Sequence, residues 1–481
     1  MHLRRLTLLA CLISLVIACQ ASADARASRT DIARVYLEID QAYMQADALS
    51  PQERRRISRD FDRATAQFFS GDAATAVNSL IEILADLAPP DSRSDTVSSA
   101  GVLARFTPDR LVMGADALTL DLDHATGAFP DGPAIELSIV GPANEPLWSA
   151  MIDAPADFDL SGLIPALKPA RYELRAKAGT VTRPVAFFDV VSIDPRESAA
   201  SFRDRLNNCK APAPELRAAA DLARSRLALL ERPTDIQRLL NPAEPLRLAI
   251  DTEVSAIEQG RNPYRDLTGH LWASITIGGR EVPFRVYIPA LRASPMPLVL
   301  ALHGAGGDEN LFPTAYGDAE LTRLADESGF VIAAPSTYLV FGAPQVASDF
   351  IDAMALFAPI DADRVYAIGH SLGGIAASSL ARALPDKLTA ACCLAGLAPL
   401  PPGPPMCPLL VYSAEFDIIV PDARIKPLAD RLIAADEPVE YRLAENEGHT
   451  LMVGPLLRPS IEWLLAHSRN RPDPPDIAPG Q

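Results

Sequence analysis

The sequence predicts an α/β protein, with a doubly wound α/β domain in the second half of the chain and smaller helical and β-sandwich modules before it. Three patterns lead to this prediction. After residue 264, short continuous apolar runs alternate with helical stretches, as buried parallel strands and their connecting helices do. Between residues 102 and 193 apolar and polar residues alternate, which indicates half-buried strands. Residues 30–88 and 195–260 instead repeat apolar residues every three or four positions, which indicates helices.

Changes between these patterns divide the chain into parts. Ser50-Pro51-Gln52-Glu53 is a capping box with proline at the first helical position, so a helix should begin there. His124 lies among acidic residues and is predicted to be solvated on the polar face of a strand. The predicted parts are a signal peptide (1–25), a helical hairpin region (30–90), a β-sandwich module (100–193), a helical connector (195–262), the α/β domain (264–468) and a disordered tail (469–481).

Composition and charge narrow the classes of function. The chain has 481 residues, of which 48% are hydrophobic and 22% are charged, which is ordinary for a globular protein. Its net charge is −17, and a surface of this sign repels phosphate backbones and anionic lipid. We therefore expect no nucleic-acid partner. Six cysteines are too few to hold a chain of this length together by disulfide bonds.

The first 25 residues have the pattern of a secretory signal. Arg4 and Arg5 precede an apolar run over residues 6–18, and small residues follow it. This run is shorter than the roughly 20 residues that a membrane-spanning helix needs. No other stretch reaches about 18 uninterrupted apolar residues. We therefore expect an exported protein, located in the periplasm or cell envelope or secreted.

Two interpretations of the signal's cleavage site remain open. Ala21-Ser22-Ala23 offers a small-x-small site before Asp24. Val16-Ile17-Ala18-Cys19 instead resembles a bacterial lipobox, in which Cys19 becomes the lipidated first residue. In that case the signal ends before Cys19, and a lipid anchor is the one membrane contact that we expect. Export also permits disulfide bonds, with pairing undetermined, among four further cysteines: Cys209, Cys392, Cys393 and Cys407.

The strongest motif in the chain is Gly369-His370-Ser371-Leu372-Gly373. An apolar run over residues 365–368 precedes it and a helical run follows, which is the strand–turn–helix context of a nucleophile elbow. Neighbours without a Cβ atom allow the tight, strained turn that exposes the serine hydroxyl. We therefore predict Ser371 as a nucleophile. The alternative is a glycine-rich turn with a structural serine.

A serine hydroxyl is a poor nucleophile without a base, and the seven histidines of the chain are the candidates for that base. His449 follows Gly448 in a polar loop after the predicted strand 439–443. His467 ends the final predicted helix, where its charge favours the helix C-terminus. His449 is therefore the predicted base.

The third member of a triad holds the other ring nitrogen of the base. Asp417 lies just beyond the end of the predicted strand 409–413, and a strand and a helix fit between it and each of Ser371 and His449. Glu415 and Asp422 lie nearby and are the alternatives. We predict Asp417 as the residue that orients the base.

A second glycine-rich segment, His303-Gly304-Ala305-Gly306-Gly307, follows the predicted strand 298–302. Glycines allow a backbone N–H group to approach a developing oxyanion closely. We predict an oxyanion hole formed by the N–H group of Ala305 and that of Leu372, the residue after the nucleophile. The alternative is an ordinary glycine-rich turn.

These pieces, in the order Ser–Asp–His, resemble the α/β-hydrolase superfamily over about residues 265–468. Within that match, the segments 297–304 and 363–371 are similar to secreted feruloyl esterases, polyhydroxyalkanoate depolymerases and dienelactone hydrolases. The prolyl-oligopeptidase catalytic domain shares much of the pattern, but the first 260 residues lack the repeated strands of its propeller. The resemblance implies serine hydrolase chemistry without a cofactor. His370 stands at a position that varies among these relatives, so the subfamily stays open.

The expected function is an exported serine hydrolase that cleaves carboxylic esters through an acyl-enzyme. Its substrate would be a small-molecule or polymer-linked ester, with protein or carbohydrate contacts through the N-terminal modules. A serine peptidase of prolyl-oligopeptidase-like type and an inactive hydrolase-like binding protein are the alternatives. No H-E-x-x-H pattern is present, so no metal is expected. Five of the twelve residues in 395–406 are proline, which predicts an open site without a helical lid.

Overall fold

The computed structural model describes residues 27–46, 49–127, 129, 134–210, 213–290, 294–401, 403 and 405–469. The predicted signal peptide, with Cys19, and all but the first residue of the predicted tail lie outside these residues. The chain divides into two compact units. The first unit contains Arg63–Pro212, Arg226–Arg261 and the residues before Met44, and the second contains Met44–Asp62, Ala213–Ser225 and the chain from Asn262 onward.

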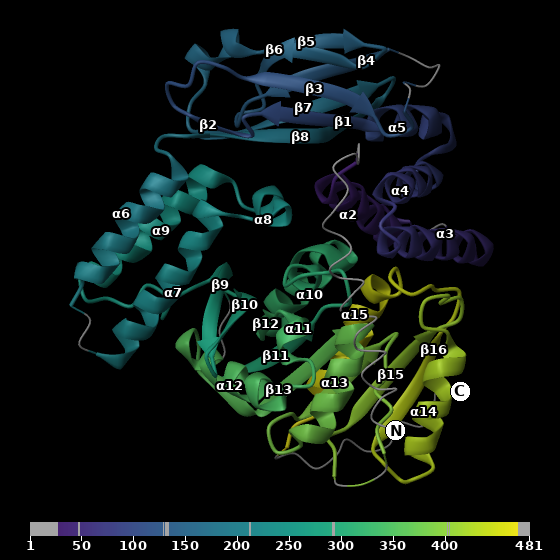
Figure 1. Cartoon of the computed structure of the whole chain (residues 1–481). Helices are drawn as coiled ribbons and strands as arrows, with labels where there is room; N and C mark the ends of the chain where they lie inside the picture. The colour runs from purple at the N-terminus through teal and green to yellow at the C-terminus, as the bar shows by residue number, and fades with distance from the viewer. Residues whose placement is uncertain are drawn as a thin grey trace. The chain divides into compact units, whose positions relative to one another are not determined.

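In the described residues of the second unit, eight strands form one mixed sheet, drawn in green to yellow in Figure 1. The strands are β9 (Gly269–Ile277), β10 (Arg280–Ile288), β11 (Met296–Leu302), β12 (Val331–Pro335), β13 (Ile360–His370), β14 (Ala390–Leu394), β15 (Leu409–Ala414) and β16 (Val439–Ala444). Their spatial order is β9-β10-β12-β11-β13-β14-β15-β16. Strand β10 runs antiparallel to both of its neighbours, and the other neighbouring pairs are parallel.

Helices connect the parallel strands and bury them. The helices are α10 (Tyr316–Ser328), α11 (Thr337–Val340), α12 (Pro344–Ala353), α13 (Leu372–Ala383), α14 (Asp422–Ile433) and α15 (Val453–Ala466). Every residue of β11, β12, β14 and β15 is buried, as expected for strands covered on both faces. This strand order and its helical connections are those of the α/β-hydrolase fold, which confirms the predicted doubly wound α/β domain.

The local sequence signals correspond to the observed elements. The hairpin between β9 and β10 turns at Gly278 and Gly279, whose φ angles of 57° and 75° belong to the left-handed region that glycine favours. The predicted strands 298–302, 409–413 and 439–443 lie in β11, β15 and β16, and the apolar run over residues 365–368 lies in β13. Strand β14 was not predicted as a strand. It contains Cys392 and Cys393, which are buried, and the pKa of both thiols is raised by that burial. Cys209 and Cys407 are, like these two, free thiols.

Two segments from the first half of the chain belong to the second unit. Residues 44–62 include the first part of α3 (Pro51–Phe69). Residues 213–225 include α7 (Pro214–Glu231) from its first residue to Ser225. Helix α3 begins at the predicted capping box: Ser50 N donates to Glu53 Oε2 at 2.9 Å, and Glu53 N donates to Ser50 Oγ at 3.3 Å. The second unit is therefore not confined to residues 264–468.

In the part of the first unit that the structure describes, the remaining helices accompany two smaller sheets. Its helices are α2 (Arg29–Gln45), α4 (Ala73–Leu87), α5 (Arg93–Ala100), α6 (Pro195–Asn208), α8 (Asp235–Leu240) and α9 (Ala243–Glu258). One sheet has the order β1 (Val102–Thr107), β3 (Thr119–His124), β6 (Ala156–Asp159). The other has the order β2 (Arg110–Val112), β8 (Val181–Val191), β7 (Ala170–Ala178), β4 (Ile135–Val140), β5 (Pro146–Ile152). Apolar residues of both sheets share one core.

The prediction for His124 is wrong. The residue is fully buried, with Nδ1 at 2.9 Å from Thr126 Oγ1 and Nε2 at 3.3 Å from the Ser98 carbonyl oxygen. His124 is in phase with the buried Leu120 and Leu122 of β3, so the period-two alternation itself places it on the apolar face, and its acidic neighbours were a misleading signal. Among the described residues, no helix is both long enough and apolar enough to span a bilayer.

Candidate active site

Ser371 lies in a strained turn between β13 and α13. Its φ and ψ angles are 54° and −113°, a region that a residue with a side chain rarely adopts, and its N–H donates to the Leu394 carbonyl at 2.8 Å. The turn requires glycine around it. A Cβ atom on Gly369 would lie 2.0 Å from the Gly373 carbonyl oxygen, and one on Gly373 would lie 1.8 Å from that of Leu302. The geometry is that of a nucleophile elbow.

His449 and Asp417 form a buried pair beyond the ends of β16 and β15. His449 Nδ1 lies 2.6 Å from Asp417 Oδ2, and the two residues are 3% and 5% exposed. The other carboxylate oxygen, Oδ1, accepts hydrogen bonds from Ile419 N at 2.8 Å and Val420 N at 2.7 Å. The carboxylate is therefore fixed by its own turn, and its bond to Nδ1 leaves Nε2 of the imidazole as the basic nitrogen.

The alternatives to this pair have other partners. Glu415 Oε2 accepts a hydrogen bond from Asn446 N at 2.9 Å. Asp422 Oδ1 accepts from Ser413 Oγ at 2.6 Å and also from Tyr441 OH. His467, which follows α15, lies with Nδ1 at 2.8 Å from the Trp463 carbonyl oxygen. The structure thus brings Asp417, and neither Glu415 nor Asp422, to His449.

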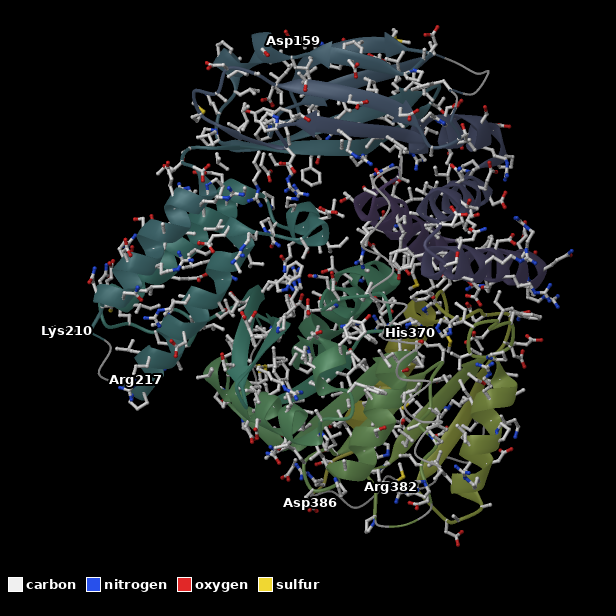
Figure 2. All side chains as sticks on the ribbon, viewed as in Figure 1. Asp159, Lys210, Arg217, His370, Arg382 and Asp386 are labelled. Atoms are coloured by element: carbon white, nitrogen blue, oxygen red, sulfur yellow. The ribbon has the colours of Figure 1, made fainter. Side chains whose placement is uncertain are left out.

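His370, labelled in Figure 2, connects the elbow to the His449 loop. His370 Nε2 lies 2.9 Å from the His449 carbonyl oxygen, which can only accept, so Nε2 carries the proton. Tyr316 OH then donates to Nδ1 at 2.8 Å. Burial, together with the neighbouring His449, holds the pKa of His370 well below its usual value. His370 is therefore a neutral bridge between the residue next to Ser371 and His449.

The rings of His370 and His449 lie 4.8 Å apart, centroid to centroid. The candidate base therefore lies beside the elbow. Among the described residues, the structure shows no hydrogen bond between the Ser371 hydroxyl and the His449 ring. Such bonds commonly tighten only when substrate is bound, so this geometry is compatible with proton transfer between them.

The glycine-rich segment after β11 is anchored by His303. His303 Nε2 accepts a hydrogen bond from Thr337 N at 3.0 Å, so Nδ1 carries the proton and donates to the Gly304 carbonyl at 2.8 Å. Burial lowers the pKa of His303 and keeps this ring neutral. Gly306 N donates to Tyr338 OH at 2.7 Å. The segment is therefore held against the start of α11.

The same segment lies against the elbow. A Cβ atom built on Gly304 would lie 3.4 Å from Ser371 Cβ, so the backbone before Ala305 is in van der Waals reach of the candidate nucleophile. Leu372 is the first residue of α13, and N–H groups at a helix N-terminus carry partial positive charge. Leu372 thus follows Ser371 directly, and Gly304, the residue before Ala305, lies beside it; the oxyanion hole itself stays a prediction.

Three residues near this site were not identified from the sequence: His370 as a bridge, Tyr316 as its partner, and Asp62 on α3. Asp62 is fully buried, as is Ser58 one helical turn earlier. The one signal in the sequence was their position, because Ser58 and Asp62 are four residues apart and directly follow Ile57 and Phe61 of the apolar stripe. The sequence contains no indication of which segment that pair contacts.

Comparisons with known proteins find similarity to esterases, although no family model matches the chain. “Putative esterase NocK” of Nocardia uniformis subsp. tsuyamanensis is 30% identical over 196 residues, which cover 37% of this chain and 55% of that protein. Feruloyl esterase B of Thermothelomyces thermophilus is 27% identical over 134 residues, covering 24% of this chain and 45% of that protein. The chain is similar to esterases of the α/β-hydrolase superfamily. The predicted resemblance is thereby confirmed.

This esterase-like chain spans about half the length of each of those two relatives. The bifunctional acetylxylan esterase/xylanase XynS20E of Neocallimastix patriciarum is 36% identical over 105 residues, covering 20% of this chain and 15% of that protein. Among solved structures, a thermostable esterase matches with a TM-score of 0.35 and 21% identity, covering 42% of this chain and 63% of that chain. The fold assignment rests on the strand order of this chain.

Proposed function

We propose that the protein is an exported serine hydrolase that cleaves carboxylic esters through a covalent acyl-enzyme. The observation that supports this most is the convergence of the strained Ser371 elbow with the buried His449–Asp417 pair, whose nitrogen and oxygen lie 2.6 Å apart. The esterase relatives support the choice of an ester as the bond that is cleaved.

In the first half of the proposed reaction, Ser371 Oγ attacks the carbonyl carbon of the ester while His449 Nε2 accepts the hydroxyl proton. The carbonyl oxygen becomes an oxyanion, which the N–H groups of Ala305 and Leu372 stabilise. When the tetrahedral intermediate collapses, the carbon–oxygen bond to the alcohol breaks. The imidazolium of His449 returns its proton to the leaving alcohol, so that an acyl-Ser371 ester remains.

In the second half, a water molecule attacks the acyl-Ser371 carbonyl and transfers a proton to His449 Nε2. Collapse of the second tetrahedral intermediate releases the carboxylic acid and returns the proton to Ser371 Oγ. Asp417 keeps the proton of the resting imidazole on Nδ1 and stabilises the imidazolium formed in both halves. No group besides these side chains and backbone N–H groups is needed to balance the reaction.

Ester profiling tests this function. The purified protein would be assayed on p-nitrophenyl esters of short, long and aromatic acids, and on peptide p-nitroanilides, with hydroxylamine trapping of the acyl-enzyme. The proposal expects ester turnover with a burst of p-nitrophenol equal to the protein present. Faster turnover of the peptide amides than of every ester would favour the peptidase alternative instead. Absence of turnover on all of them would favour the inactive binding protein.

The site is expected to prefer small acyl groups. The described part of residues 395–406 forms no helix, and Tyr338 in α11 is 39% exposed, so no helical lid covers the elbow from these segments. Long acyl chains need an extended apolar channel to bury their surface. We expect the highest kcat/KM for acetyl to butyryl or aromatic acyl esters, and no rate increase on micelle formation. A preference for chains longer than about ten carbons would contradict this expectation.

We also propose the role of the remaining parts. The two sheets of the first unit share one apolar core and are assigned to a β-sandwich module, with helical modules before and after it. These modules would orient the hydrolase domain on a protein or carbohydrate surface and bring it to a polymer-linked ester. Binding of the full chain to insoluble xylan or to cell-wall material, measured by co-sedimentation, tests this role.

Export makes a prediction about the mature N-terminus. If Cys19 is lipidated, intact mass spectrometry of the protein from a bacterial envelope fraction will show a diacylglyceryl cysteine at residue 19. If the small-x-small site is used, the mature chain will begin with a free amine at Asp24. A protein that keeps Met1 would contradict export by either route.

A further inference from the structure

Helix α3 places one carboxylate against the backbone of His449. His449 N donates to Asp62 Oδ1 at 3.0 Å and to Oδ2 at 3.1 Å, and Ile418 N donates to Oδ2 at 3.3 Å. Asp62 is fully buried. Its two oxygen atoms therefore hold the N–H groups of two segments at once, the one that carries His449 and the one that follows Asp417.

Neighbouring contacts fix this part of α3 to the same two segments. Arg54 Nη1 forms an ion pair with Glu447 Oε1 at 2.9 Å. A Cβ atom on Gly448 would lie 3.0 Å from Ser58 Cβ, so the helix and the loop are in direct contact. The Arg59 guanidinium lies 4.8 Å from the centroid of the Phe416 ring. Residues 44–62 accordingly belong to the same compact unit as the hydrolase sheet.

The peptide groups on both sides of His449 Cα are thus bonded to buried side chains. Asp62 accepts from the N–H group, and His370 donates to the carbonyl at 2.9 Å. Asp417 bonds the ring itself at 2.6 Å. These three contacts come from α3, from the elbow and from the turn after β15. A base held at its ring and at both of its peptide groups has little freedom to leave the position from which it reaches the nucleophile.

We propose that Asp62 is a positioning residue of the esterase, which holds the backbone of His449 in the geometry needed for proton transfer from Ser371. This inference rests on the proposed function. It makes α3, which lies outside residues 264–468, a part of the catalytic machinery. The N-terminal region then contributes to the rate of the chemical step and not to substrate delivery alone.

The charge of Asp62 gives this role a measurable signature. Burial raises the pKa of Asp62 to about 7, while His449 lowers it and Asp417 raises it further. His449 and Asp417 are the titratable groups facing Asp62 from the loops, and Arg54 and Arg59 are charged groups on its own helix. An anionic Asp62 places a negative charge beside the imidazolium that forms on His449 during the reaction. Protonation of Asp62 near pH 7 removes this charge, so part of the fall of kcat/KM on the acid side should belong to Asp62 and disappear when Asp62 is replaced.

The test compares two substitutions of Asp62 with a matched control. Asp62→Ala removes both acceptors, Asp62→Asn keeps one acceptor without the charge, and Asp60→Asn alters a partly exposed acid two residues away on α3. Each variant is assayed on p-nitrophenyl acetate from pH 5 to 9, with active sites counted by a fluorophosphonate. We expect Asp62→Ala to lose about 10- to 100-fold in kcat per active site, with KM changed less than about threefold.

Asp62→Asn should recover at least about fivefold of that loss, and its acid limb should lack the titration near pH 7 that Asp62 gives the wild type. Asp60→Asn should match the wild type in both respects. The proposal is overturned if kcat per active site and the acid limb of both Asp62 variants stay at wild-type values. It is also overturned if the variants merely contain fewer active sites, since that result indicates a structural role.

Failure of the proposed function is distinguishable from failure of this inference. If the wild type hydrolyses no ester, the proposed function fails, and the variants are compared by their rate of fluorophosphonate labelling at Ser371, which needs the same base. Slower labelling of Asp62→Ala, with partial recovery in Asp62→Asn, then supports the positioning role. Equal labelling rates of the variants and the wild type overturn it.

Discussion

Replacing Ser371 with alanine is expected to lower kcat for ester hydrolysis by about 10⁴- to 10⁶-fold while leaving the fold intact. The substitution removes one oxygen atom from a partly buried side chain, and alanine at this φ is no more strained than serine. Without the hydroxyl, no acyl-enzyme can form. The measurement is the steady-state rate on a short acyl ester, with circular dichroism to verify the fold.

Titration with a fluorophosphonate provides the control for Ser371→Ala. The wild type should bind one equivalent, and the variant should bind none. A neighbouring hydroxyl, Ser378 in α13, offers a matched substitution: it donates to the Gly374 carbonyl at 3.0 Å and lies away from the reacting atoms. Ser378→Ala should keep its labelling. An unchanged hydrolysis rate in purified Ser371→Ala would remove Ser371 from the mechanism.

Replacing His449 with alanine should inactivate the enzyme by a similar factor, whereas His467→Ala should lose less than about tenfold. His449 is bonded to Asp417 at 2.6 Å and lies beside the elbow. His467 instead packs on Trp463 at the end of α15, with ring centroids 4.2 Å apart. The measurement is kcat/KM of both variants at the pH optimum of the wild type.

The His449 variant leaves Asp417 buried without its ring partner, which costs stability. Thermal unfolding of both variants is therefore measured beside activity, and the assay is run well below the lower transition. Exogenous imidazole should restore part of the activity of His449→Ala, because it can occupy the vacated volume and act as the base. Inactivation by His467→Ala together with an active His449→Ala would reverse the assignment of the base.

The strands of the hydrolase domain could be found from the sequence because burial on both faces produces continuous apolar runs. The run in β11 is an example: all seven of its residues are buried. Strand β14 was not predicted because its residues before Leu394 are alanine or cysteine, and the strand includes no β-branched or aromatic residue. The order of the strands within the sheet could not be predicted from the sequence. β11 lies between β12 and β13, and such pairings are decided by the packing of distant segments.

The candidate nucleophile could also be predicted from the sequence, because its motif consists of residues close together in the chain. A nucleophile elbow needs glycine on both sides of Ser371, because a Cβ atom there would collide with nearby backbone atoms. These glycines lie within two residues of the serine, so the motif can be recognised in the sequence. Separating Asp417 from Glu415 and Asp422 required the structure. All three acids lie within the eight residues that run from the end of β15 to the first residue of α14, and only the fold shows which carboxylate faces His449.

The sequence by itself determined the fold class of the hydrolase domain, the candidate nucleophile and the candidate base, because each depends on residues close together in the chain. The tertiary structure alone decided the surroundings of that base. Asp62 and His449 are 387 residues apart, and a helical pattern shows which face of α3 is buried but not what covers it. The neutral bridge of His370 likewise depends on a carbonyl 79 residues away. Hydrogen bonds to a backbone group require no particular residue type from their partner, so they leave no pattern in a single sequence.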